Sequence, residues 1–219
     1  MILNFDYTKK YDYENGFYLT SDSSRIGKLV SQYELYKKIT GLSGDFVECG
    51  VFKGASLIRF ATFRELLESQ NSRKIIGFDM FGSFPRVDRD DDNDFIEKFE
   101  NTSGGGIEKK QLEDILKTKG FRNIQLIRGD LTETIDEYLN MNSALRIALL
   151  HIDVDVYKPT KYVLERLFPR VVAGGLVVLD DYGMVNGATE AVDEYLEKNN
   201  QGVQIQKLPY YQVPAYIVK

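Results

Sequence analysis

Two apolar runs that each end in a pair of carboxylates constrain this 219-residue chain most strongly. The first run ends at Asp153 and Asp155, and a second run, one helix further along, ends at Asp180 and Asp181. Neighbouring strands of an open parallel sheet deliver their C-terminal ends to one crevice, where such folds bind ligands. Carboxylates gathered there repel one another unless a cation or an exchangeable proton joins them. We therefore predict a hard divalent metal such as Mg²⁺, held by oxygens beside a bound small molecule.

A simpler interpretation of these four residues is two solvated strand ends whose aspartates cap turns, which is common for isolated Asp residues. Asp153 and Asp155 lie on the same side of the strand if it stays extended that far, and only one of them need contact the metal directly. Four carboxylates on two neighbouring strands favour the metal interpretation.

The overall charge narrows the class of partner. A formal net charge of −5 argues against nucleic acid or an anionic membrane as the main partner. The sequence contains no transmembrane run, and its first residues are too polar for a signal peptide. One cysteine, Cys49, excludes an internal disulfide framework and fits a cytoplasmic protein. One histidine, His151, makes a His-rich zinc site improbable; we expect it to be a satisfied core residue.

Strand and helix patterns alternate along most of the chain. The expected strands are Asp45–Cys49, Lys74–Asp79, Ile124–Arg128, Arg146–Val154 and Leu176–Asp180. The expected helices are Arg25–Thr40, Ala55–Glu68, Ile107–Lys119, Thr132–Leu139, Thr160–Phe168 and Ala188–Asn199. Apolar strands interleaved with helices predict an α/β fold with a mostly parallel sheet and helices on both faces.

Three regions depart from this rhythm. The runs Val203–Leu208 and Ala215–Val218 are too close together for a crossover helix, so we expect an antiparallel hairpin at the sheet edge. Residues 1–43 should form an N-terminal cap or helical extension whose first two dozen residues look irregular. Residues 80–106 are acidic and glycine-rich at their end, which is typical of a lid loop. The whole chain, 1–219, is expected to be one domain.

A glycine turn follows the first expected strand, in the motif VECGVFKGAS from Val47 to Ser56. Gly50 and Gly54 allow the backbone to approach a ligand, but their spacing is not that of a dinucleotide-binding motif. Glu48, two residues before the first glycine, suits a ligand with an ammonium group or hydroxyls better than a pyrophosphate. A tight turn with a structural glutamate is the alternative interpretation.

Two further aspartates follow strands two and three. A carboxylate at the position of Asp79, some tens of residues past a glycine turn, commonly binds a ribose diol, although a loop or helix cap is the alternative. Gly129 and Asp130 could contact a base ring or could simply begin the next helix.

Taken together, these residues resemble the class I S-adenosylmethionine (SAM)-dependent methyltransferases, which have a Rossmann-like fold. More narrowly, the segments GDFVECGVFKGAS, IIGFDMFGSFP, LLHIDVDVYKPT and GGLVVLDDYG resemble the TylF/MycF family of metal-dependent sugar O-methyltransferases. The resemblance covers about residues 25–200. The chain has Val154 where the family often has Gly, and Met80-Phe81 where it often has Ser-Phe, so a macrolide acceptor is not implied.

The resemblance also implies roles for individual residues. Asp153 would be both a metal ligand and the catalytic base, and Asp180 and Asp181 would complete the metal shell. The SAM-binding residues would be Glu48, Gly50, Gly54, Ser56, Asp79, Gly129 and Asp130.

The predicted function is a SAM- and Mg²⁺-dependent O-methyltransferase acting on a hydroxyl of a sugar, a nucleotide-sugar or a glycosylated natural product. Its partners would be small molecules, and a homo-oligomer is the expected assembly. Asp153-Val154-Asp155 is also a D-x-D sequence, so a metal-dependent glycosyltransferase is an alternative. A catechol-type O-methyltransferase and a non-catalytic protein with a SAM-binding fold are two others.

Overall fold

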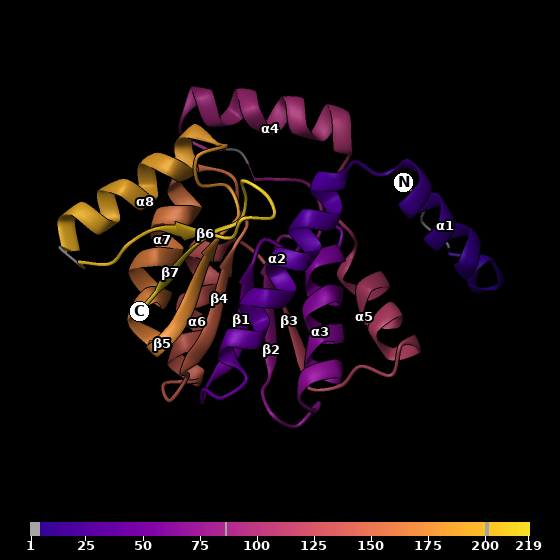
Figure 1. Ribbon diagram of the computed structural model, residues 1–219. Helices are drawn as coiled ribbons and strands as arrows, with labels where there is room; N and C mark the ends of the chain where they lie inside the picture. The colour runs from indigo at the N-terminus through magenta and orange to yellow at the C-terminus, as the bar shows by residue number, and fades with distance from the viewer. Residues whose placement is uncertain (1–4, 86, 200–201) are drawn as a thin grey trace.

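A seven-stranded sheet in the order β3-β2-β1-β4-β5-β7-β6 forms the centre of the computed structural model, which describes residues 5–85, 87–199 and 202–219 (Figure 1). The strands are β1 Asp45–Cys49, β2 Ile75–Asp79, β3 Ile124–Arg128, β4 Ile147–Ile152, β5 Val171–Leu179, β6 Gln206–Lys207 and β7 Ala215–Val218. The first five strands run parallel, and β7 runs antiparallel to both β5 and β6. The predicted C-terminal hairpin is therefore confirmed.

Helices cover both faces of the sheet, as the apolar strands require. The helices are α1 Lys10–Thr20, α2 Ser23–Ile39, α3 Ala55–Leu67, α4 Asp90–Ser103, α5 Lys109–Thr118, α6 Leu131–Met141, α7 Tyr157–Leu167 and α8 Asn186–Asn199. Apolar side chains of α2, α3 and α5 pack on one face, and those of α6, α7 and α8 pack on the other. Every residue of β4 is buried, because this central strand is covered from both sides.

The direction of chain progression reverses between β1 and β4. The first three strands extend to one side in the order β1, β2, β3, and the chain then crosses to the other side of β1 to form β4 and β5. In sheets of this kind the crevice outside the C-terminal strand ends at such a switch point is the usual ligand site. The register places Glu48 of β1 directly beside His151 of β4.

Two segments that we expected to be irregular contain helices. Residues 10–20 form α1, an exposed helix without buried side chains, and it projects from the body of the fold (Figure 1). Residues 80–106 contain α4, a helix of 14 residues that lies across the C-terminal edge of the sheet (Figure 1). Three aspartates in the first turn of α4 favour the helix because they oppose its positive N-terminal dipole. Position 86 lies outside the described residues.

Smaller differences concern where elements begin. Helix α7 starts at Tyr157, three residues before the expected start, although Pro159 is in its first turn. Proline is tolerated there because the first N–H groups of a helix have no partner within it. Strand β5 begins at Val171, five residues early, and includes the exposed Ala173 and Gly174. Within the described residues, no helix combines the length and apolar character that crossing a bilayer requires.

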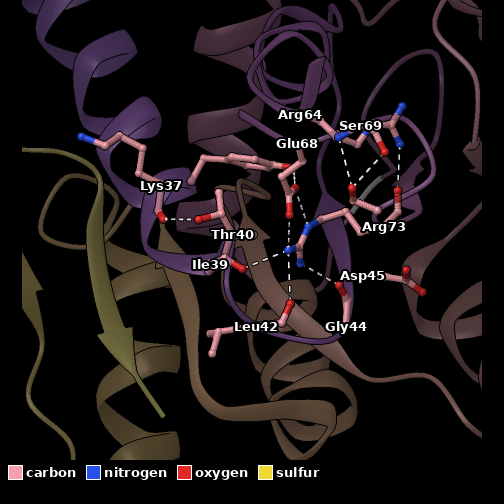
Figure 2. Close-up of polar contacts among 12 residues, drawn as sticks. Lys37, Ile39, Thr40, Leu42, Gly44, Asp45, Arg64, Glu68, Ser69 and Arg73 are labelled. Atoms are coloured by element: carbon pink, nitrogen blue, oxygen red, sulfur yellow. Dashed lines mark hydrogen bonds and ion pairs between the residues drawn. The ribbon is translucent and has the colours of Figure 1, made fainter. Parts of the chain in front are cut away.

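At the N-terminal end of the sheet, the buried Arg73 holds several elements together. The guanidinium of Arg73 bonds both carboxylate oxygens of Glu68 and also donates to the carbonyl oxygens of Ile39, Leu42 and Gly44 (Figure 2). Arg73 thereby joins the end of α2, the entry to β1 and the loop before β2. The pair is almost fully buried, at 2% and 7% side-chain exposure, and so depends on these partners.

Arg73→Met should therefore destabilise the protein by about 3–5 kcal/mol, because Glu68 and the carbonyl oxygens would stay buried without their donor. Arg166→Met, which removes an exposed pair with Asp136, is the matched control and should cost less than about 1 kcal/mol. Urea denaturation followed by circular dichroism measures both values, and equal costs would contradict this account.

Candidate functional site

A cavity of about 470 Å³ opens at the C-terminal ends of β1, β2, β4 and β5. The turns after these strands line it, together with the first turns of α2 and α3 and the segment that leads into α4. This is the crevice at the switch point that the alternating sequence pattern predicts. The cavity has two chemically different parts, a glycine turn after β1 and a group of carboxylates after β4 and β5.

The glycine turn approaches β4 so closely that a side chain cannot fit. Gly50 has φ of +90°, and a Cβ atom there would lie 1.7 Å from the carbonyl oxygen of Asp153. Gly54, at φ +80°, is the N-cap of α3. Gly50 and Ser56 line the cavity, whereas Gly54 and the fully buried Glu48 do not. Binding of a donor by Glu48 and Gly54 stays a prediction.

Asp79, at the end of the neighbouring strand β2, organises the turn. Its Oδ2 accepts hydrogen bonds from the backbone N–H groups of Val51 and Phe52 at 2.8 and 2.9 Å. Its Oδ1 accepts from the N–H of Phe81 at 2.5 Å. Phe52 and Phe81 both have positive φ, which is unfavourable for such bulky residues, so these hydrogen bonds hold a strained backbone in place. Asp79 therefore has a structural role besides its predicted ribose contact, which remains open because it also lines the cavity.

Asp130 caps a helix, as one of its two interpretations proposed. Its Oδ1 accepts a hydrogen bond from the N–H of Thr132 at 2.8 Å and so begins α6. It also lines the cavity, whereas Gly129 does not. Contact of either residue with a base ring stays a prediction.

A chain of alternating charges runs through the acidic part of the site. His151 Nδ1 donates to Glu48 Oε1 at 2.9 Å, and His151 Nε2 faces Asp180 Oδ1 at 3.4 Å. The other oxygen of Asp180, Oδ2, is 2.5 Å from the ammonium of Lys28, which comes from α2. Thus Asp180 is held by a cation on each oxygen, and His151 is the satisfied core residue that the sequence predicts.

These contacts determine the charge states of the chain. Burial alone would lower the pKa of His151, but its bonds to Asp180 and Glu48 raise it to about 10, so the ring is a cation with both nitrogens protonated. Burial would raise the pKa of Asp180, but His151 and Lys28 hold it well below its usual value. Burial is likewise outweighed at Lys28, whose pKa is raised by nearby carboxylates.

Within the described part of the chain, Asp153, Asp155 and Asp181 form no ion pair of this kind. Burial and the charge of Asp180 raise the pKa of Asp153 well above its usual value and that of Asp155 to about 6. Burial and the neighbouring aspartates also raise the pKa of Asp181, although its Oδ2 accepts a hydrogen bond from the N–H of Asp155 at 3.0 Å. Asp155 has φ of +62°, so the strand does not stay extended to this residue, and Asp153 and Asp155 do not continue its alternation.

Possible metal ligands can be sorted by this geometry. Among the described residues, one ligand atom each from His151, Asp153 and Asp180 lie within 4.8 Å of one another. Both ring nitrogens of His151 face carboxylate oxygens, those of Glu48 and Asp180, so its place is to orient Asp180. Asp153 and Asp180 are close enough to share an ion, and ligation by Asp181 stays a prediction.

The sequence analysis missed two contacts of the site, those of Lys28 and His151. Lys28 lies within a helix pattern and gave no hint that it would reach the carboxylates. His151 could have been paired with Glu48, because each lies on the penultimate position of its strand and β1 and β4 are neighbours.

Helix α4 covers the edge of the cavity and is attached at both ends. Asp92, in its first turn, is 2% exposed and accepts a hydrogen bond from the N–H of Tyr157 at 3.1 Å. Near the other end, Glu100 Oε1 accepts from the N–H of Phe84 at 2.9 Å, and the rings of Phe84 and Phe99 stack edge to face beside the cavity. The buried Asp92 and the helix around it correct the expectation of an acidic loop. Movement of this segment as a lid stays a prediction.

Comparison with known proteins identifies the class and then the family. The sheet order with its antiparallel β7 is that of class I methyltransferases, as in the solved apo structure of CalS11, described as a TDP-rhamnose 3′-O-methyltransferase of calicheamicin biosynthesis. Its sequence is 27% identical to this one, and the two structures superpose with a TM-score of 0.71. The match covers 99% of this chain and 89% of the CalS11 chain. The family model for macrocin O-methyltransferases, TylF, matches residues 23–213, so the chain belongs to this family.

Two curated relatives from Streptomyces are also named as O-methyltransferases. An 8-demethyl-8-(2,3-dimethoxy-α-L-rhamnosyl)-tetracenomycin-C 4′-O-methyltransferase of Streptomyces olivaceus is 27% identical over 162 residues, 71% of this chain. A demethyldecarbamoylnovobiocin O-methyltransferase of Streptomyces niveus is 28% identical over the same share. The chain spans 59% of the length of each relative. Membership of the TylF family argues against the glycosyltransferase alternative.

The raised pKa of Asp155 predicts how stability depends on pH without added metal. The folded protein holds this proton up to about pH 6, whereas the unfolded chain loses it near pH 3.8, so unfolding becomes easier as pH rises through this window. Asp155→Asn removes the free-energy cost of ionising this carboxyl in the folded protein, about 2–3 kcal/mol at pH 7.5. Asn also tolerates the positive φ. Thermal unfolding from pH 4 to 7.5 in EDTA should show the variant gaining on wild type, whereas parallel curves would contradict the assignment.

Proposed function

We propose that this chain is a SAM-dependent O-methyltransferase that modifies a sugar hydroxyl of a glycoside or nucleotide-sugar with the aid of Mg²⁺. One observation carries the proposal: the glycine turn with Asp79 and the carboxylates after β4 and β5 line one cavity. Family membership and the names of the relatives support the reaction and the acceptor class. A cytoplasmic homo-oligomer remains our expectation.

The donor half of the cavity would receive SAM. Asp79 is placed to accept hydrogen bonds from the ribose hydroxyls, and Gly50, which lets the turn lie against the carbonyl of Asp153, lines the same cavity. Ser56 and Asp130 line the same space and would contact the amino-acid and adenine ends. Methyl transfer is an in-line displacement, so the main task of these residues is alignment.

The residues of the acidic half fit a divalent metal. This half of the site has five carboxylates, which can carry five negative charges, and two cations, His151 and Lys28, are paired with them. The carboxylates are those of Glu48, Asp153, Asp155, Asp180 and Asp181. Burial first, and the neighbouring carboxylates second, raise the pKa values of Asp153, Asp155 and Asp181. Carboxylate oxygens are the ligands that Mg²⁺ prefers, and Asp153, Asp180 and Asp181 would hold it.

A bound Mg²⁺ would polarise the acceptor hydroxyl and make it easier to deprotonate. Asp153 would accept the proton as the hydroxyl oxygen bonds to the methyl carbon and the sulfur–carbon bond breaks, which leaves a methyl ether and S-adenosylhomocysteine. A base must be ionised, and a divalent cation nearby would lower the raised pKa of Asp153 towards that state. Lys28 and His151 keep Asp180 ionised and fix its orientation.

The metal is tested with conservative variants. Asp180→Asn and Asp181→Asn each remove one charge at nearly constant shape, so the affinity for Mg²⁺ should fall and added Mg²⁺ should partly restore the rate. Asp153→Asn should be worse, with a loss of at least about 100-fold, because added metal cannot replace a base. Mass-detected methylation of nucleotide-sugars and glycosides measures these rates. Full activity of chelator-treated enzyme would refute the metal, and an active Asp153→Asn with an inactive Asp155→Asn would move the base to Asp155.

The donor site is tested at Asp79. Asp79→Ala should weaken SAM binding by on the order of 1.5–3 kcal/mol for each lost bond to a ribose hydroxyl. Because Asp79 also holds two turns, Asp79→Asn is the matched variant, since its remaining oxygen can still accept from a backbone N–H. Calorimetry with thermal unfolding as the check on folding distinguishes the roles, and unchanged affinity in both folded variants would move the donor elsewhere.

A further inference from the structure

One wall of the cavity, formed by α2 and α3, is basic. Arg25, Lys28 and Gln32 follow one another at spacings of three and four on α2, so they lie on one face of the helix. Arg25 and Lys28 line the cavity, and Arg59 of α3 lines it beside them. The guanidinium of Arg59 donates to Gln32 Oε1 at 3.2 Å, which links the two helices.

The cations of this wall differ in their partners. Lys28 is paired with Asp180. Among the described residues, neither Arg25 nor Arg59 forms an ion pair with a carboxylate, although Arg73 and Arg89 both do. Gln32 is fully buried, and its Nε2, a hydrogen-bond donor, has no partner within the described part of the chain. Arg25 and Arg59 therefore present donors to the cavity with which no carboxylate of the described residues forms an ion pair.

The two guanidinium groups are close enough to repel. Burial and the positive charge of Arg25 lower the pKa of Arg59, while Asp180 and Glu48 act in the opposite direction. Two like charges beside a cavity are unfavourable unless an anion lies between them. Guanidinium groups bind carboxylate and phosphate groups in a bidentate manner, which suits such a position.

We propose that Arg25 and Arg59 bind one oxyanion of a ligand held in the cavity, either the carboxylate of the methyl donor or a phosphate of a nucleotide-linked acceptor. The proposal rests on the proposed function, because it assumes that one of these ligands occupies the cavity. The anion would lie against α2 and α3, and the reacting end of the ligand would extend towards Asp153, which lines the same cavity. The basic wall would thus set the direction in which the ligand enters.

The test is calorimetry with three probes and the variants Arg25→Met, Arg59→Met and the double variant. S-adenosylhomocysteine carries the amino-acid carboxylate, and 5′-deoxy-5′-methylthioadenosine has the same nucleoside without the amino acid. Thymidine diphosphate carries phosphates but no carboxylate. Arg166→Met, which removes an exposed guanidinium far from the cavity lining, is the control. Thermal unfolding of each variant reports on the fold.

We expect Arg59→Met to weaken the binding of one anionic probe by about 10- to 100-fold. The double variant should bind that probe more weakly still, and the affinity for methylthioadenosine should stay unchanged. Loss at S-adenosylhomocysteine assigns the donor carboxylate, and loss at thymidine diphosphate assigns the acceptor phosphate. Unchanged affinity for both anionic probes, or equal loss for all three probes, would overturn the proposal. Failure of the wild type to bind either nucleoside thioether would instead count against the proposed function.

Discussion

The site depends on how negative charge is distributed at the C-terminal ends of β4 and β5. Several carboxylates cannot share this small space as anions, so the fold supplies cations to some of them. His151 reaches Glu48 and Asp180 from within the sheet, and Lys28 reaches Asp180 from α2. Asp180 is therefore a fixed anion, whereas Asp153 is left with a raised pKa.

This division explains how one cavity can serve two tasks. The glycine turn, held by Asp79, gives a rigid and mostly backbone surface that suits a donor molecule. The carboxylates across from it give a site whose charge is completed by a cation, which suits the activation of a hydroxyl. Because Gly50 lies against the carbonyl of Asp153, the two halves touch, as a direct transfer between donor and acceptor requires.

Much of this could be predicted from the sequence, for physical reasons. Strands such as Asp45–Cys49 and Ile124–Arg128 were predicted to the residue because short apolar runs between turn residues have few alternatives. Helix α4 was missed because it is attached to the fold through contacts such as the buried Asp92, and its apolar pattern is limited to Phe95, Ile96 and Phe99 within an acidic sequence. The contact of Lys28 with Asp180 joins residues 152 positions apart, and no local pattern specifies such a pair.

The central claim is that donor and metal occupy one cavity, and paramagnetic broadening tests it most directly. SAM labelled with ¹³C in its methyl group would be bound to the enzyme, and Mn²⁺ would be added in place of Mg²⁺. We expect the methyl signal of bound SAM to broaden strongly in the wild type, and much less in Asp180→Asn at the same Mn²⁺ concentration. A sharp methyl signal in wild-type enzyme that has bound both SAM and Mn²⁺ would contradict the account.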